Sequence, residues 1–81
     1  MDILTTTVEL FGSAGCPHTT ALREHLHWYR IAFTEYDVDH DAVARARLLS
    51  LTGGRPTVPL LVENGRVTSI GWLGRSCAIG S

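Results

Sequence analysis

The chain has 81 residues, of which 44% are hydrophobic and 19% are charged, and its formal net charge at pH 7 is −1. This length suits a single small domain over residues 1–81 with a modest core, and it is too short for two domains. The basic residues are all arginines, spread from Arg23 to Arg75, which argues against nucleic acid as a partner.

A strand-to-helix unit opens the chain. Residues 7–11 carry β-branched and aromatic side chains and are followed by the glycine-containing residues 12–15, which predicts a strand and then a turn. Pro17 suits the first position of a helix that runs to about residue 30. Side chains at helical spacing are expected on its inner face: Ala21, Leu22, His25, Leu26 and Tyr29. Residues 33–38 alternate like a strand, so parallel pairing across the helix is expected.

A second helix and a hairpin follow. Asp39 or Asp41 can cap the helix, and the Gly-Gly pair at residues 53–54 ends it. Its inner face is expected to carry Val43, Ala44, Arg47, Leu48 and Leu51. Residues 57–62 predict a strand, and Asn-Gly at residues 64–65 predicts a tight hairpin with an antiparallel strand after it. The predicted fold class is α/β, in the order β-α-β-α-β-β, with a mixed four-stranded sheet.

Cys16 begins the sequence Cys-Pro-His-Thr at the predicted start of the first helix. Unpaired backbone N–H groups and the positive end of the helix dipole favour a thiolate there, so Cys16 is the candidate nucleophile. The alternative is a buried, inert cysteine. His18 either helps to stabilise the thiolate or is a solvated surface residue. Thr19 either brings its hydroxyl near the sulfur or is only a helix residue.

These residues, Thr-Val-Pro at residues 57–59 and the following hairpin together resemble the glutaredoxin family of the thioredoxin superfamily. The resemblance implies a thioredoxin-like fold, thiol–disulfide oxidoreductase activity and a cis peptide bond before Pro59. It also implies substrate contacts by Pro17, His18, Thr57, Val58 and Pro59. Val58 would offer its backbone N–H and C=O to it.

More narrowly, residues 15–19 and 71–77 resemble a small bacterial glutaredoxin-like group in which selenocysteine can occupy the position of Cys16. The chain departs from the wider family in three ways. The loop before Cys16 lacks the lysine that contacts glutathione in many members, and Trp72 follows Gly71 where the family has a second glycine and an acidic pair. The closing helix is reduced or absent. Arg55, Gly71 and Trp72 are nevertheless retained as candidate substrate contacts, Arg55 for a carboxylate.

Cys77 is the candidate resolving thiol. Dithiol members of the family carry their second cysteine where this chain has Thr19, so resolution requires Cys77 or an external thiol such as glutathione. In glutaredoxin-like folds the segment after the last strand returns toward the active site, which favours Cys77. Otherwise Cys77 is a bystander in a terminal tail. The expected substrate is a disulfide-containing protein or small molecule.

No cofactor is expected beyond glutathione or another low-molecular-weight thiol as co-substrate. A binding function is the alternative, in which Cys16 and glutathione hold an iron–sulfur cluster. A metal site formed by Cys16, His18 and Cys77 matches no familiar ligand spacing.

The N-terminal residues and the cysteine content favour a cytoplasmic location. The chain begins with Met1 and the acidic Asp2, without the basic and apolar regions of a signal peptide, and no apolar run is long enough for a membrane span. Two widely separated cysteines do not form the dense disulfide framework of a small secreted domain. We therefore expect no membrane contact.

We predict that the chain forms a homodimer. In the full glutaredoxin fold a third helix covers sheet area beside the first helix, so its loss should expose apolar side chains that a second copy can bury. Light scattering over a series of protein concentrations should give a mass that rises toward that of a dimer. A strictly monomeric protein at high micromolar concentration would contradict this prediction.

Overall fold

A mixed four-stranded sheet forms the centre of the computed structural model, which describes residues 7–79. β1 (Val8–Gly12) pairs in parallel with β2 (Thr34–Asp37) and antiparallel with β4 (Leu60–Glu63). β5 (Arg66–Ile70) pairs antiparallel with β4, which gives the strand order β2-β1-β4-β5. The predicted α/β class with a mixed four-stranded sheet is confirmed.

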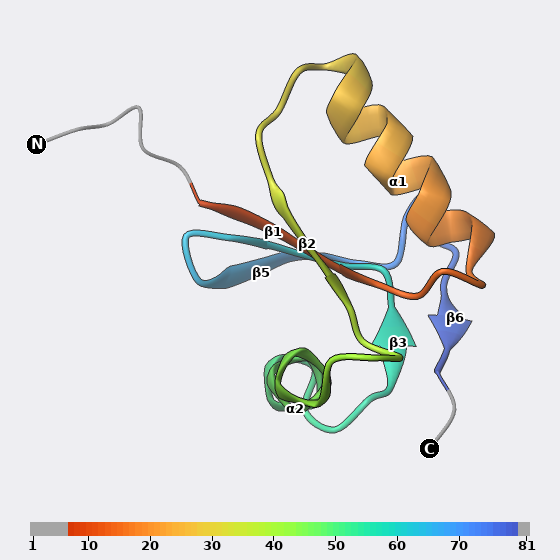
Figure 1. The fold of residues 1–81 in the computed structure, drawn as a ribbon, viewed down its shortest axis with the longest axis vertical. Coiled ribbons are helices and arrows are strands. Elements are labelled where there is room, and N and C mark those ends of the chain that lie inside the picture. Colours follow the sequence, from red (N-terminus) through yellow and green to blue (C-terminus); the bar gives the residue numbers. More distant parts are fainter. Residues whose placement is uncertain (1–6, 80–81) are drawn as a thin grey trace, which may run out of the picture.

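The two helices cover opposite faces of this sheet, as Figure 1 shows. α1 (Pro17–Trp28) packs Leu22 and Leu26 onto one face, and α2 (Ala42–Leu51) packs Ala44 and Leu48 onto the other. Neighbouring residues of β1 and β4 face opposite sides of the sheet, so each strand contributes side chains to both cores. In each helix the two residues named are four positions apart and therefore lie on one helix face. The core on the α2 face contains Phe11, Val38, Leu60 and Val62, and the core on the α1 face contains Val8, Leu10 and Leu61.

Each helix buries fewer of its expected inner-face side chains than the sequence predicts. Asp41 is the residue that caps α2, since its side chain accepts a hydrogen bond from the Ala44 N–H at 3.0 Å. Val43 was expected on the inner face of α2, but it is 74% exposed. Tyr29 was expected on the inner face of α1; it follows the end of the helix and is 62% exposed. Helical spacing therefore located the helices but overestimated the width of their buried faces.

The predicted strand over residues 57–62 is divided. β3 (Thr57–Val58) leaves the central sheet at Pro59 and joins a second, two-stranded sheet with β6 (Cys77–Ala78). No strand was predicted for the segment that forms β6. Among the described residues after β5 there is no helix, in agreement with the expectation that the closing helix is reduced or absent.

A cavity of about 180 Å³ opens beside α1. Its lining consists of Val8, Leu22, His25, Leu26, Ile31, Leu61, Glu63 and Trp72. Trp28 and Ile70, which are 81% and 47% exposed, add apolar surface to the molecule. The predicted homodimer, in which a second copy would bury such surface, stays a prediction.

Neither of the two described helices is long and apolar enough to cross a membrane.

Glu9 is a charged residue that lies almost completely buried in the central strand β1, at 8% exposure. Arg47 of α2 donates two hydrogen bonds to its carboxylate, at 2.7 and 3.1 Å, and the Tyr36 hydroxyl donates a third at 3.0 Å. The Arg47 guanidinium also lies over the Phe11 ring, 5.1 Å from its centroid. Hydrogen bonding to Arg47 holds the pKa of Glu9 below its usual value, and the Glu9 carboxylate raises the pKa of Tyr36. The pair fastens α2 to the sheet.

We expect Glu9→Gln to lower the free energy of unfolding at pH 7 by about 1–2 kcal/mol, since it leaves Arg47 without its charged partner. A lowered folded-state pKa stabilises the fold above the unfolded-state value and ceases to do so as the pH falls through the folded-state value. Urea unfolding at pH 7 and below about pH 4 should therefore show the difference shrinking in acid. Glu24→Gln, at an exposed helix position, is the control. An equal loss at both pH values would contradict the ion-pair explanation.

Candidate redox site

Cys16 occupies the N-cap of α1. Its backbone is extended (φ −99°, ψ 114°), and Pro17 follows as the first helical residue, where its missing N–H costs nothing. The Cys16 N–H donates to the Ser13 carbonyl at 3.1 Å, which closes the turn before the helix. The Cys16 carbonyl accepts from the N–H groups of Thr19 and Thr20. Cys16 is only 2% exposed, so its environment is set by the protein and not by solvent.

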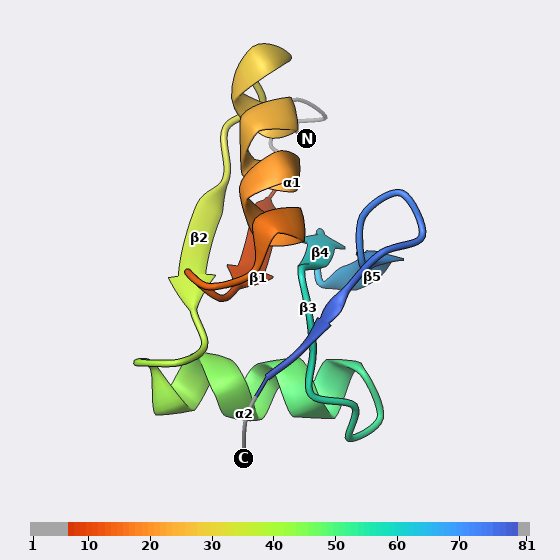
Figure 2. The ribbon, with the colours of Figure 1, turned by 90° about the vertical axis from the view of Figure 1, so that its right-hand side faces the viewer.

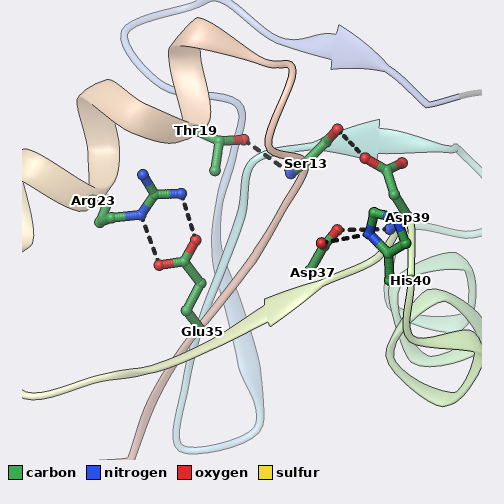
Figure 3. A network of polar contacts seen from close by, with 7 residues as sticks. All are labelled: Ser13, Thr19, Arg23, Glu35, Asp37, Asp39 and His40. Carbon is green, nitrogen blue, oxygen red and sulfur yellow. Dashed lines mark hydrogen bonds and ion pairs between the residues drawn. The ribbon is translucent and has the colours of Figure 1, made fainter.

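Thr19 fixes the loop that precedes Cys16. Its side chain is fully buried, and its hydroxyl accepts a hydrogen bond from the Ser13 N–H at 3.4 Å (Figure 3). A Cβ atom on Gly12 would lie 2.2 Å from the Thr19 Cγ2 atom, so the end of β1 and the first turn of α1 can approach this closely only with glycine at position 12. An effect of the Thr19 hydroxyl on the Cys16 sulfur stays a prediction.

The loop around Pro59 reaches the same region. The Val58–Pro59 peptide bond is cis, and both residues are buried. Val58 belongs to the apolar core that includes Cys16. The Gly71 N–H donates to the Pro59 carbonyl at 2.7 Å, so the end of β5 holds this loop. Gly71 has a φ of 86°, and a Cβ there would lie 2.7 Å from the Arg75 carbonyl oxygen, which explains the glycine.

A tight turn after Gly71 sends the chain back toward β3. Trp72 and Arg75 form a pair of backbone hydrogen bonds, at 2.7 and 3.0 Å, around the two central residues Leu73 and Gly74. Both central residues have positive φ, 54° and 77°, as in a type I′ hairpin turn. Figure 2 shows the segment that follows, in which β6 runs beside β3.

A disulfide joins Cys77 of β6 to Cys16. The two Cα atoms lie 6.0 Å apart, although the residues are 61 positions apart in the sequence. In the antiparallel ladder of β3 and β6, Cys77 lies opposite Val58 and Ala78 lies opposite Thr57. The structure thus brings together the cysteine of the first helix, the loop before Pro59 and the cysteine of the C-terminal segment.

The other predicted contacts lie at varying distances from this centre. Pro17 is exposed and His18 half-buried in the first turn of α1, and the exposed Arg55 precedes β3. The Arg55 carbonyl accepts a hydrogen bond from the Thr52 hydroxyl at 2.6 Å. Trp72 packs against the core on the α1 face, with its ring centroid 4.6 Å from that of His25. A direct substrate contact of Trp72 or Arg55 stays a prediction.

A polar network beside the loop of Ser13 was not recognised in the sequence (Figure 3). The Ser13 hydroxyl donates to the Asp39 carboxylate, and the Asp39 N–H donates to Asp37 at 3.0 Å. His40 lies 2.8 Å from Asp37; it lowers the pKa of Asp37, and Asp37 raises the pKa of His40. The contacts connect the loop before Cys16 to the turn that starts α2. Their sequence signal was the run of aspartates at alternate positions, of which Asp37 was assigned to a strand and Asp39 and Asp41 were interpreted only as candidate helix caps.

One ion pair in Figure 3 connects α1 to β2. Arg23 donates to both carboxylate oxygens of Glu35, at 2.7 and 2.6 Å, and its pKa is raised by this partner. Within residues 7–79 no group of three or more His, Cys, Asp and Glu side chains is arranged to hold a metal ion.

The sequence of this chain matches the Glutaredoxin family model over residues 8–68, and the chain therefore belongs to the Glutaredoxin family. The crystal structure of the thioredoxin-like protein BC3987 is similar, with 32% sequence identity and a TM-score of 0.69 over 76% of this chain and 84% of that one. A mutant of BC3987 gives 32% identity and a TM-score of 0.70 over 78% of this chain and 80% of that one.

Glutaredoxin 1 from Francisella tularensis, crystallised with cacodylate, shares the fold. It is 21% identical, with a TM-score of 0.59 over 84% of this chain and 85% of that protein. No curated protein sequence matches the chain. The family and the fold support thiol–disulfide exchange in general.

We expect the reduced Cys16 to be more acidic than an unperturbed cysteine, because Cys16 is the N-cap of α1 and so lies at the positive end of the helix dipole. The rate of alkylation of a Cys77→Ser variant, measured against pH, gives the pKa of Cys16 directly. The matching Cys16→Ser variant reports Cys77 as the reference. A Cys16 that titrates at or above the value of a free cysteine, or that resists alkylation, would remove it as the nucleophile.

Proposed function

We propose that the chain is a thiol–disulfide oxidoreductase in which Cys16 is the nucleophile and Cys77 the resolving thiol. The observation that supports this proposal most directly is the disulfide between these two residues, the only cysteines of the chain. Membership of the Glutaredoxin family supports the same class of reaction in general. The helix N-terminus at Cys16 adds a physical reason for the assignment of nucleophile, since it stabilises the thiolate.

The reaction begins with both cysteines reduced. The Cys16 thiolate attacks one sulfur of a substrate disulfide; a bond forms between Cys16 Sγ and that sulfur, and the other substrate sulfur leaves as a thiolate that takes up a proton. The Cys77 thiolate then attacks Cys16 Sγ, which forms the internal disulfide and releases the second substrate thiolate. Two electrons pass to the substrate, and the two thiols of the chain become oxidised.

Two equivalents of a low-molecular-weight thiol, such as glutathione, restore the reduced chain and are themselves oxidised to a disulfide. Cys16 is 2% exposed and Cys77 is half-buried, so the incoming thiolate reaches the Cys77 sulfur more easily. Attack there releases the Cys16 thiolate, and the helix N-terminus at Cys16 favours this thiolate as the leaving group. The exposed Arg55 just before β3 is available for a carboxylate of the incoming thiol.

We expect Cys77→Ser to convert the chain into a one-thiol form that accumulates as a mixed disulfide with its substrate and turns over only when glutathione is added. Wild-type protein after mild oxidation should lack free thiols, and its internal disulfide should stabilise the fold by about 4 kcal/mol in the chain-entropy model. Intact-mass measurement, thiol counting and denaturant unfolding of both proteins provide these values.

Cys16→Ser is the control, and it should abolish reductase activity. An oxidised wild-type protein that keeps one alkylatable thiol, together with normal turnover of Cys77→Ser without glutathione, would contradict the resolving role of Cys77. Oxidised dimers linked through Cys77 would instead show resolution between two subunits.

A further inference from the structure

The C-terminal segment lies in the redox site as an extended strand. Its pairing with β3 places Cys77 opposite Val58, and a further backbone hydrogen bond of 2.7 Å runs from the Ile79 N–H to the Pro56 carbonyl. Figure 1 shows β6 beside β3, and the two strands form a sheet separate from the four-stranded one. The edge of β3 is therefore occupied by a strand of this same chain, whose cysteine is bonded to Cys16.

Side chains of this segment alternate between the protein and solvent, as in any strand. Cys77 faces inward to the disulfide, Ala78 is exposed, and Ile79 is 8% exposed. Ile79 belongs to the same buried apolar core as Cys16 and Val58. The core on the α2 face is thus completed by a side chain that lies two positions after the bonded cysteine.

Only a short set of interactions holds the segment once the disulfide is reduced. They are a two-residue ladder, one further hydrogen bond and the buried side chain of Ile79. A pairing of this length is marginal in water, so another extended segment can displace it. Added strands of this kind gain affinity from main-chain hydrogen bonds and specificity from pockets for alternate side chains.

Resting on the proposed function, we infer that the substrate takes the place of this segment. The preferred substrate is an extended polypeptide that pairs with Thr57 and Val58, and whose reacting cysteine is followed two positions later by an aliphatic residue in the site of Ile79. When Cys77 attacks Cys16 Sγ, the substrate cysteine leaves as a thiolate and the C-terminal strand recovers the edge. Glutathione has a single residue after its cysteine, so it cannot fill the apolar site and exchanges less favourably than such a polypeptide.

A peptide-exchange experiment tests this specificity on the full-length chain. A variant with Cys77→Ser and Ile79→Asp keeps Cys16 as its single thiol and removes the chain's own side chain from the apolar site. Peptides of sequence Ser-Cys-Ala-Xaa-Gly are exchanged onto Cys16 against glutathione, and mass spectrometry gives the equilibrium constants. The peptide with isoleucine at Xaa should be favoured over the one with aspartate by about tenfold or more, since only isoleucine gains from burial.

Peptides that differ in the residue directly after the cysteine are the matched control, because Ala78 at that position is exposed. Their equilibrium constants should agree within about twofold. Equal constants for isoleucine and aspartate at Xaa, with mixed disulfides formed on Cys16, would overturn the inferred specificity and leave the proposed function standing. Failure of Cys16 to form any mixed disulfide, together with an inactive wild-type protein, would overturn both.

A second measurement avoids the doubly substituted variant. In the chain that keeps both cysteines, the equilibrium constant for exchange of the internal disulfide with glutathione is measured. Ile79→Ala should shift it toward the reduced chain by about tenfold or more, because the disulfide form loses a buried aliphatic side chain. Ala78→Ser, on the exposed side of the same strand, should change it by less than about twofold. An unchanged equilibrium in Ile79→Ala would overturn the inference.

Discussion

The pairing of β6 with β3 is the interaction on which the arrangement of the redox site depends. It fixes Cys77 against Val58, and through the disulfide it fixes the segment after β5 against the start of α1. The pairing involves only two residues of each strand, so the preceding turn must direct the chain back antiparallel to β3. The positive φ angles of Leu73 and Gly74 provide that direction, and the hydrogen bond from Gly71 to Pro59 ties the turn to the loop that carries β3. A local backbone requirement thereby controls a contact between distant cysteines.

The two faces of the sheet are stabilised by different means. On the α2 face the apolar core is larger and is completed by Ile79, and the ion pair of Glu9 with Arg47 joins the helix to the central strand. On the α1 face a smaller apolar core is bordered by a cavity, and the contact of Arg23 with Glu35 joins the helix to an edge strand. The C-terminal segment crosses to the larger core instead of forming a third helix over the smaller one. The disulfide between Cys16 and Cys77 therefore lies in the larger of the two apolar cores.

Local signals predicted the helices and hairpin, and the family resemblance indicated the sheet and the return of Cys77 toward the active site; the pairing partners of short or irregular segments were not predicted. Asp41 lies at a helix start and acts on its own helix, and Cys16 with Pro17 marks the beginning of α1 without help from elsewhere. By contrast, the two-residue strand at Cys77 has no periodicity to detect, and its pairing with Thr57 and Val58 exists only in the folded chain. The burial of Glu9 was missed for the same reason, because its partner Arg47 lies on another element.

Separation of the two thiols has a structural consequence for the proposed cycle. Here the resolving thiol is carried by a strand, so formation of the internal disulfide places backbone along the edge of β3 and buries Ile79 in the core next to Cys16. In the proposed cycle, oxidation closes the site as the product leaves and reduction reopens it. Because the C-terminal strand and an incoming polypeptide compete for the same hydrogen bonds, the strength of this short strand sets the balance between release of product and capture of substrate.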